Sequence, residues 1–397
     1  MVQVKDLTQL RVADLWKEVK EEDFWEEVSQ ETLRMVKRLV EGVLEEEMVA
    51  HLQATWYQRG PERLGYRNGY YGRSLVTRWG LIDELRIPRD REGAFHSQVL
   101  ERYQRFQGQV EEIVREMFLR GVSTRQVEEV LEPLLGTGIS AQTLSRITRS
   151  LNAEVSRFHR RTLVDAYRYL FLDGVTMKVK GLPKAKKRLI LCAYGITEAG
   201  TRELLSFRQA TSESETQWEA MLRDLYNRGL EGDKLRLITI DGSPGLRRAL
   251  MSVYPYVPVQ RCWFHKLSNV ANKLPKKLQG QCLGELKKVY QAQSQKESIT
   301  LFRVWASRWR EAAAKAVACV EQDLEELLAF MGCPKDHWRK LRTTNAIERA
   351  FREVRRRTRP MSCFQNSASV DRIIYGIISH LNANWKKMPL PEFTHNS

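Results

Sequence analysis

The spacing of apolar residues predicts a helical N-terminal region over residues 1–58. Apolar side chains recur there at helical intervals and leave an acidic opposite face; they are Leu33, Val36, Leu39, Val40, Val43 and Leu44. An acidic amphipathic helix is a poor ligand for DNA. The face suits either a contact with another protein, including oligomerisation, or ordinary solvation.

Residues 59–107 have a different pattern and predict a small basic β-element. They are rich in Gly and Arg, and Asn68-Gly69 is a turn signal. The segments SLVTRWG and LIDELRI alternate as short strands. The element suits either a contact with phosphates or a plain surface hairpin.

Residues 108–160 return to helical spacing and predict three helices, with breaks at Gly121-Val122 and Gly136-Thr137-Gly138. Ser123 and Ser140 occupy N-cap positions. Two short helices followed by a third, basic helix suit a helix-turn-helix, although a three-helix bundle that binds nothing has the same pattern. Its candidate DNA contacts are Arg125, Arg146 and Arg149.

Residues 161–274 predict an α/β fold. The order of strands and helices is βββαβαβα, and the first three strands are joined by short turns, so we expect an antiparallel meander. This order is that of a ribonuclease-H-like core, a mixed five-stranded sheet with helices on both faces.

The rest of the chain is predicted to be helical. Residues 275–338 lack any strand signal and are expected to form an all-helical insertion or subdomain. Residues 339–397 would complete the core with helices over 343–359 and 367–385. The tail from Met388 contains two prolines, and we expect it to be frayed.

Composition narrows the class of protein. Apolar residues make up 42% and charged residues 29% of the 397 residues, as in soluble globular proteins. No run approaches the roughly 20 apolar residues of a membrane span, and the N-terminus lacks a signal-peptide pattern, so we expect a cytoplasmic protein without a membrane partner. The six cysteines form no CxxC pair and predict reduced thiols.

The charge is strongly basic and unevenly placed. The formal net charge is +16, yet residues 1–50 contain 7 Lys/Arg and 13 Asp/Glu. The remaining chain therefore carries +22. A basic body of this kind attracts polyanions, of which nucleic acid is the commonest.

Two aspartates are candidates for metal-dependent chemistry. Asp173 ends an apolar strand in FLDG, and Asp241 ends another in ITIDG. Sites of open α/β sheets form at strand ends. Two carboxylates brought together there repel each other unless a cation lies between them, and Mg²⁺ prefers such oxygen ligands. Asp-Gly is also an ordinary strand-to-turn signal, which is the competing interpretation.

Glu348 is the third candidate, on the helix TTNAIERAFREVRRRTR. The pattern leaves catalysis and helix capping open, because Asn345 and Glu348 fit an N-cap with a capping glutamate, and Glu348 and Arg352 are spaced as an ion pair. Between His337 and Pro360 there are nine Lys/Arg against two Glu, which favours a helix that lies on a phosphate backbone. Its candidate DNA contacts are Asn345, Arg349, Arg352, Arg355, Arg356 and Arg359.

Cys262 and His265 form a CxxH pair in RCWFH. Such a pair is half of a zinc site, but no second pair lies close by, so structural zinc is not expected. The pair suits either residues near DNA or a packed thiol and imidazole at the start of a helix.

Taken together, these motifs resemble bacterial insertion-sequence transposases of the Mutator-like type. The resemblance covers roughly residues 40–385. It rests on the stretches EEEMVAHLQA, YRNGYYGRS, IPRDREGAF, LRGVSTRQVEEVLEPLLG, LDGVTMKV, ITIDGSPGLRRAL, QRCWFHKLSNV and TTNAIERAFREVRRRTRPM.

The resemblance implies an Asp-Asp-Glu transposase on a ribonuclease-H-like fold. The family's carboxylates fall on Asp173, Asp241 and Glu348, and its Cys-x-x-His motif falls on Cys262 and His265. It also implies that the helical N-terminal region binds terminal inverted repeats and that a helical insertion precedes the Glu. Such a protein would associate with the bacterial nucleoid when it is bound to DNA.

We expect two Mg²⁺ ions, or Mn²⁺ as a substitute, to promote cleavage at the transposon ends and strand transfer into target DNA. Pairing two ends calls for at least a homodimer. Two other functions compete. A junction resolvase would not need such an extensive N-terminal DNA-reading region, and a non-catalytic helix-turn-helix regulator would not need all three carboxylates.

Overall fold

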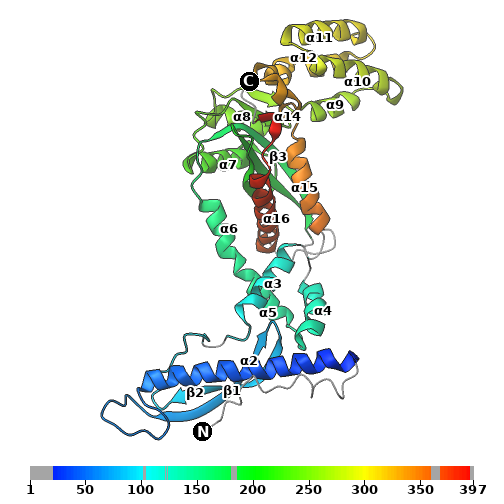
Figure 1. Cartoon of the computed structure of the whole chain (residues 1–397). Coiled ribbons are helices and arrows are strands. Elements are labelled where there is room, and N and C mark those ends of the chain that lie inside the picture. Colours follow the sequence, from blue (N-terminus) through cyan, green and yellow to red (C-terminus); the bar gives the residue numbers. More distant parts are fainter. Residues whose placement is uncertain are drawn as a thin grey trace. The chain divides into compact units, whose positions relative to one another are not determined.

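The computed structural model describes residues 21–101, 104–120, 122, 124–179, 186–358 and 367–393 (Figure 1). The chain forms two compact units. Unit 1 comprises Met1–Phe118 and Val122–Arg149, and unit 2 comprises Leu119–Gly121 and Ser150–Ser397.

Unit 1 is built on the long helix α2 (Glu21–Leu52) and the antiparallel hairpin of β1 (Arg67–Thr77) and β2 (Gly80–Asp90). One apolar face of α2 packs on the hairpin through Leu33, Val36, Val40 and Leu44. Leu39 and Val43 are exposed. The predicted helical region is confirmed over Glu21–Leu52, and residues 1–20 lie outside the described residues. Its extension to residue 58 is wrong, because the backbone turns to positive φ at Gln53 and the helix ends.

The acidic face of α2 makes contacts within its own unit. Glu45 forms an ion pair of 2.8 Å with Arg67. Glu41 and Glu47 accept hydrogen bonds from the backbone N–H groups of Arg86 and Gln98, respectively. These glutamates therefore hold the hairpin and the loop that follows it, which is a role that the helical pattern alone did not indicate.

The predicted turn at Asn68-Gly69 is wrong. Both residues lie inside β1, where the register with β2 shifts between Arg67 and Tyr70. Gly69 has φ +69°, as an irregular strand position of this kind requires. The connection between the strands is instead the two-residue loop Arg78-Trp79, because Thr77 pairs with Gly80.

Three helices complete unit 1: α3 (Gly108–Leu119), α4 (Thr124–Leu135) and α5 (Ala141–Arg149). Their apolar faces share a core with Val76 and Phe106. Ser140 caps α5, because its hydroxyl accepts a hydrogen bond from Thr143 N–H (3.3 Å). Ser123 lies outside the described residues.

The third predicted helix, which the pattern extends to residue 160, is two helices. The first of them, α5, ends at Arg149. The second, α6 (Leu151–Arg160), begins after Ser150, the residue at which this part of unit 2 starts. Serine competes with the helix by bonding nearby backbone groups, which makes it a weak interior residue. The apolar period continues across this break, so periodicity could not reveal it.

The predicted five-stranded mixed sheet is confirmed in unit 2. Its order is β5-β4-β3-β6-β7, with β3 (Tyr167–Val179), β4 (Lys186–Thr197), β5 (Arg202–Ala210), β6 (Leu237–Ile240) and β7 (Val259–Arg261). The first three strands are an antiparallel meander, and β6 and β7 are parallel to β3. The order βββαβαβα is also confirmed, with α7 (Glu215–Asn227), α8 (Pro244–Val253) and α9 (Trp263–Ala271).

Helices cover both faces of this sheet (Figure 1). On one face, strand residues such as Leu172 and Leu205 pack with Trp218 of α7 and Leu250 of α8. On the other, α16 (Ser367–Lys387) is held by Asn382, whose amide donates to Leu204 O and accepts from Leu204 N–H. The helix α15 (Asn345–Thr358) lies beside β3 and α16.

Between α9 and α15 the described chain is helical, as predicted. It forms α10 (Lys276–Gln291), α11 (Gln295–Trp309), α12 (Ala314–Glu321), α13 (Leu324–Leu328) and α14 (Trp338–Leu341), with short 3₁₀ turns at Ala329–Gly332 and Lys335–His337. None of the helices among the described residues is both long enough and apolar enough to cross a membrane.

The expectation of a frayed tail is wrong as far as Phe393. Leu390 N–H donates to Gly200 O (2.9 Å), and Phe393 stacks on His337 with ring centroids 4.2 Å apart. Burial of these two apolar side chains outweighs the disorder that the prolines signalled. Cys192, Cys262, Cys282, Cys319 and Cys333 are free thiols, and Cys363 lies outside the described residues.

Candidate active site

Parallel pairing of β3 and β6 brings two aspartates side by side. Leu172 pairs with Ile240, so Asp173 and Asp241 are the next residues of two neighbouring strands. β6 ends there, but β3 continues to Val179 and pairs Asp173 with Cys192 of β4. The expectation that Asp173 ends its strand is therefore wrong. It marks the end of the β3–β6 pairing instead.

The backbone after Asp241 turns sharply. Gly242 has φ +100°, and a Cβ there would lie 3.0 Å from Nε of Arg261. Arg261 donates from Nη2 to Gly242 O (2.6 Å) and so fixes this turn. Asp241 Oδ1 accepts the backbone N–H of Ser243 (2.9 Å), just before α8. The positive φ favours glycine here, and a Cβ would also press on the guanidinium group of Arg261.

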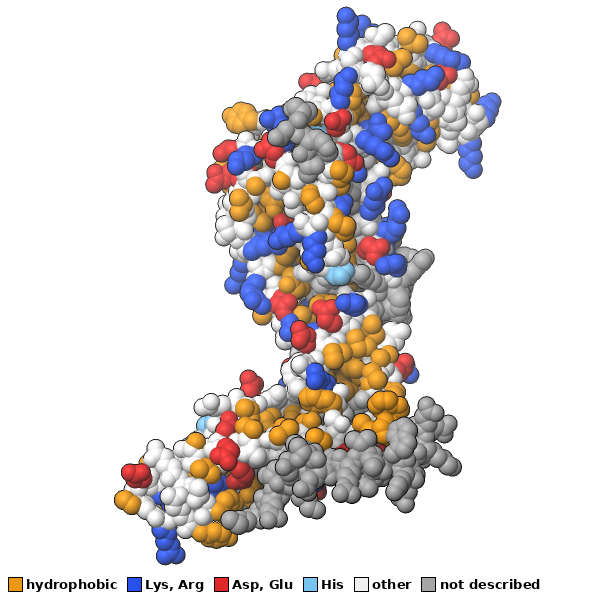
Figure 2. All heavy atoms as spheres, viewed as in Figure 1, with side chains coloured by type: hydrophobic (Ala, Val, Ile, Leu, Met, Phe, Trp, Pro, Cys, Tyr) orange, Lys and Arg blue, Asp and Glu red, His pale blue; other side chains and the backbone are white. Residues whose placement is uncertain are grey.

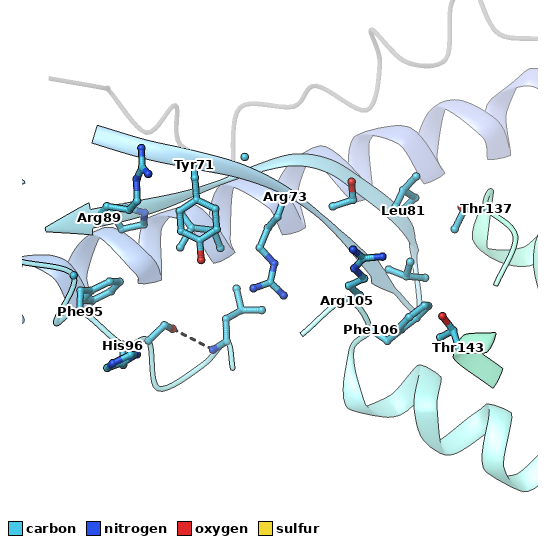
Figure 3. Close-up of a pocket in the computed structure, with 18 of the residues that line it drawn as sticks. Tyr71, Arg73, Leu81, Arg89, Phe95, His96, Arg105, Phe106, Thr137 and Thr143 are labelled. Atoms are coloured by element: carbon cyan, nitrogen blue, oxygen red, sulfur yellow. Dashed lines mark hydrogen bonds between the residues drawn. The ribbon is translucent and has the colours of Figure 1, made fainter. Parts of the chain in front are cut away.

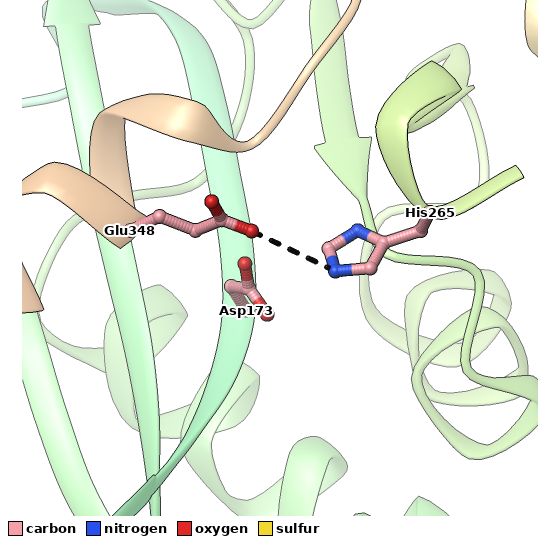
Figure 4. Close-up of side chains that lie close together, drawn as sticks. All are labelled: Asp173, His265 and Glu348. Atoms are coloured by element: carbon pink, nitrogen blue, oxygen red, sulfur yellow. Dashed lines mark ion pairs between the residues drawn. The ribbon is translucent and has the colours of Figure 1, made fainter. Parts of the chain in front are cut away.

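Asp173, His265 and Glu348 lie together (Figure 4), and their ligand atoms are all within 4.8 Å of one another. They come from β3, α9 and α15, respectively. His265 Nε2 is 3.8 Å from Glu348 Oε1. Asp241 is not a member of this trio, but its charge acts on Asp173 and His265.

The site concentrates negative charge in a partly buried place. Asp173 is 5% exposed. Burial, and then the charge of Asp241, raise its pKa to about 7. Hydrogen bonding to Thr344 and the neighbouring His265 oppose this rise. An acid in this state either keeps a proton or needs a cation beside it.

His265 carries the compensating charge. Hydrogen bonding to the Cys262 sulfur raises its pKa to about 9, against the effect of burial, and the charges of Cys262, Asp173 and Asp241 add to the rise. His265 Nδ1 is buried and has no partner of strict hydrogen-bond geometry within the described chain, so the sulfur contact is a loose one. The raised pKa favours the protonated imidazole, whose positive charge offsets the neighbouring carboxylates.

Cys262 holds the start of the helix that carries Glu348. Its sulfur accepts from the backbone N–H (3.4 Å) and the hydroxyl (3.6 Å) of Thr344. Thr344 O in turn accepts from the N–H groups of Ile347 and Glu348, so Thr344 is the N-cap of α15. The interpretation of Asn345 as the N-cap is therefore wrong. A capping glutamate would accept a hydrogen bond from the Thr344 N–H, but this N–H donates to Cys262 Sγ instead.

The basic residues of α15 are exposed. Ile347, Phe351 and Val354 are buried on the inner face of the helix. The candidate DNA contacts Asn345, Arg349, Arg352, Arg355 and Arg356 face solvent, and Arg359 lies outside the described residues. In the space-filling view, Lys and Arg side chains lie over the part of unit 2 where Figure 1 places α15 (Figure 2).

The candidate contacts of unit 1 are also exposed. Arg146 and Arg149 lie on α5, and Arg149 donates from Nε to Ser145 O (3.3 Å). Arg125 lies on α4, 3.6 Å from Glu129. Because these arginines are already exposed, they can contact a polyanion without any rearrangement of the protein.

The donor set of the site fits a divalent cation. The carboxylates of Asp173, Asp241 and Glu348 offer the hard oxygen ligands that Mg²⁺ or Mn²⁺ prefers. A cation there would also relieve the repulsion between Asp173 and Asp241. The phosphodiester groups of DNA are substrates on which such a site can act.

The comparisons with known proteins decide the family. The family model described as "Transposase, Mutator family" matches residues 8–388. The chain belongs to the Mutator family of transposases.

Curated relatives of this transposase span most of its length. The transposase for insertion sequence element ISRM5 of Rhizobium meliloti is 36% identical over 88% of this chain and 87% of its own. The transposase for element IS406 of Burkholderia multivorans is 33% identical over 87% of this chain and 89% of its own. That for IS256 in transposon Tn4001 of Staphylococcus aureus is 32% identical over 86% and 88%. These matches favour a transposase over a resolvase or a regulator.

Sequence reasoning did not single out Glu213, an acidic residue near the candidate site. Glu213 lies between β5 and α7, and its carboxylate touches the position that a Cβ of Gly174 would occupy. Burial raises its pKa, and the charge of Asp241 adds to the rise. A loop glutamate in the segment TSESE has no periodic or motif signal, so only the packing against Gly174 reveals it.

Proposed function

We propose that unit 2 is the catalytic core of an Asp-Asp-Glu transposase of the ribonuclease-H-like type, with α10–α14 as an insertion. Asp173, Asp241 and Glu348 would hold Mg²⁺, with Mn²⁺ as a substitute. The proposal is supported by the pairing of β3 with β6. Asp173 and Asp241 directly follow a register pair of these strands, and Asp173 lies close to Glu348 and His265. The order βββαβαβα supports the fold assignment.

Divalent ions bound there would activate the attacking oxygen, which is water in cleavage and the 3′-hydroxyl in strand transfer, and would stabilise the leaving oxygen of an in-line phosphoryl transfer. The residues of the chain orient the DNA. Protonated His265 presents a positive N–H beside Glu348, where it can bind a phosphate oxygen. Arg349, Arg352, Arg355 and Arg356 would hold the backbone in register. Cleavage at a transposon end would free a 3′-hydroxyl, which the same site would then join to target DNA.

Unit 1 would bind the terminal inverted repeats through α5. Two features of α5 support this assignment: its N-cap at Ser140, and the exposed side chains of Arg146 and Arg149. In helix-turn-helix proteins the second helix of the motif enters the major groove. The structure offers α4 and α5 as this pair, joined by residues 136–140.

Two transposon ends call for two protein copies, and we propose a homodimer. Trp25, Leu39 and Val43 are exposed apolar residues of α2 and are the surface we assign to it. Replacing Leu39 and Val43 by Glu leaves the packed face of α2 intact. A dimer seen by light scattering should then become a monomer; an unchanged mass would exclude this surface.

Asp241→Asn tests the catalytic proposal. The variant keeps the shape of the side chain but loses its charge, so strand transfer of end-sequence DNA in Mg²⁺ should fall by roughly 10³-fold. Asp233→Asn is the matched control, because Asp233 is exposed and lies away from the site. Full activity of Asp241→Asn would overturn the proposal.

A further inference from the structure

A groove in unit 1 lies between the hairpin and the start of α5 (Figure 3). Its volume is about 990 Å³. One wall is formed by β1 and β2, with Tyr71, Arg73 and Arg89. The loop after β2 contributes His96 and Arg105. Ser140 and Thr143, at the N-terminus of α5, line the groove as well.

The charge of this groove is positive. Arg73, Arg89 and Arg105 line it, and Figure 3 shows Arg73 and Arg105 projecting into its middle. Asp90 is the one acidic residue among the described lining residues, and it is buried. Its carboxylate accepts from the backbone N–H groups of Ala94 and Phe95 and lies 3.5 Å from His51. The Asp90 carboxylate therefore stabilises the loop that follows β2 and forms no ion pair with the three arginines among the described residues.

Arg73 also has a donor that is not used. Its Nη1 donates to Glu101 O (3.3 Å), but its Nη2 is buried without a hydrogen-bond partner among the described residues. A buried N–H without an acceptor is unfavourable. A phosphate oxygen is a strong acceptor for a guanidinium group, which can bind it with two parallel hydrogen bonds. Because Nη2 of Arg73 is closed to solvent, an anion in the groove would meet the exposed guanidinium groups of Arg89 and Arg105 first, and that of Arg73 after a shift of its side chain.

The position of α5 identifies the anion. Ser140 and Thr143 belong to the first turn of this helix, the part that contacts DNA in helix-turn-helix proteins. A phosphate backbone runs along each edge of the major groove that such a helix enters. We propose that the hairpin groove binds the phosphodiester backbone of duplex DNA beside α5, through Arg73, Arg89 and Arg105. This inference rests on the proposed role of unit 1 in binding transposon ends.

Backbone contacts predict a particular pattern of binding. They position DNA without reading its sequence, so their loss weakens all duplexes alike. Each phosphate contact adds about 0.9 to the slope of log affinity against log salt. A groove for free nucleotides would instead leave duplex binding unchanged when the arginines are removed.

The test uses the full chain with Arg73, Arg89 and Arg105 replaced by Ala. Binding of a fluorescent duplex with the element's terminal sequence, and of a scrambled duplex, is measured over a range of salt in EDTA. Both affinities should fall by a similar factor, and the salt slope should fall by up to about 3. Arg38→Ala, an exposed arginine of α2 outside the groove, is the control and should have at most a small effect.

Unchanged affinity and slope would overturn the proposal, as would a loss confined to the terminal sequence or to single-stranded DNA. Hydrogen exchange on the unaltered chain avoids any folding defect of the variant. Duplex DNA should protect residues 71–74 and 93–97, and absence of protection would also overturn the proposal. The assays contain no catalytic step, so their failure leaves the result of Asp241→Asn standing, and the reverse also holds.

Discussion

Unit 2 and unit 1 hold their functional charges in different ways. In unit 2, Asp173 is buried beside Asp241, and its pKa is raised to about 7. In unit 1, Arg89 and Arg105 are exposed around a groove, and Arg146 and Arg149 are exposed on α5. Buried like charges are unfavourable until a counter-ion arrives, whereas exposed charges lose little before they bind.

The two arrangements of charge favour different kinds of ligand. A buried carboxylate cluster requires a cation at one place, and the loss of one ligand disables the whole site. An exposed arginine array requires only a polyanion, and its members act in a graded and nearly additive way. Mutations should therefore have large effects at the carboxylate cluster of unit 2 and small effects at the exposed arginines of both units.

The largest effect is expected for Glu348→Gln. The amide keeps the size of the side chain but removes a charged oxygen from the trio with Asp173 and His265, so strand transfer should fall by roughly 10³-fold. Glu353→Gln is the matched control on the same helix, because Glu353 pairs with Arg356 instead. Equal activity of the two variants in a strand-transfer assay would remove Glu348 from the site.

How much of this site the sequence could predict differs among its residues. Asp241 follows from its strand-end position before a glycine. Asp173 was selected for the same reason, but β3 continues past it, so the reason was only partly right. The local pattern fits Glu348 to a helix cap as well as to a site, because it does not show which way a helix faces; the basic residues around it and the family resemblance favour the site. The structure now gives its neighbours, Asp173 and His265.

The fold shows the same limit. Apolar periodicity predicted the order of strands and helices along unit 2, because each strand is buried, but it did not predict the pairing of β3 with β6, which are distant in sequence. It failed at Asn68-Gly69, since a bulge and a turn both call for positive φ and look alike locally. The two prolines of the tail were equally misleading at Phe393, whose burial depends on His337, distant in sequence. Contacts between distant segments leave no local signal.

Metal affinity should depend on pH because of Asp173. Its pKa of about 7 in the metal-free protein means that the carboxyl is protonated below that pH, and a cation must displace the proton. Apparent Mg²⁺ affinity should therefore fall about 10-fold per pH unit below 7 and level off above it. His265 stays charged up to about pH 9, where its deprotonation should give a further, smaller rise.

Calorimetric titration with Mg²⁺ in buffers of different ionisation enthalpy measures both the affinity and the protons released. Glu213→Gln serves as the comparison, because the pKa of Glu213 is raised as well. Persistence of the pH dependence in this variant assigns the proton to Asp173. An affinity that is constant on both sides of pH 7 would contradict the prediction.

An intermediate effect is expected at Cys262, which acts through Thr344 as a positioning residue. Cys262→Ala removes the acceptor of two hydrogen bonds at the start of α15, so Glu348 should be held less firmly. Strand transfer should fall by about 10-fold, with a higher Mg²⁺ concentration needed for half-maximal rate. Cys262→Ser restores an acceptor and should recover most of the activity. If Ser behaves like Ala, or if only thermal stability changes, the positioning role is excluded.

The smallest effect is expected for Arg352→Ala, and it separates burial from location as the cause of the difference between the units. Arg352 belongs to unit 2 but is exposed on α15, like Arg89 in unit 1. If burial decides the size of the effect, Arg352→Ala and Arg89→Ala should each lower duplex affinity only a few-fold. Each should also reduce the slope of log affinity against log salt by about 1. Arg310→Ala, at an exposed arginine paired with Glu321, is the control. A loss with Arg352→Ala as large as that of Glu348→Gln, measured in the same strand-transfer assay, would show that proximity to the carboxylates decides the size of the effect instead.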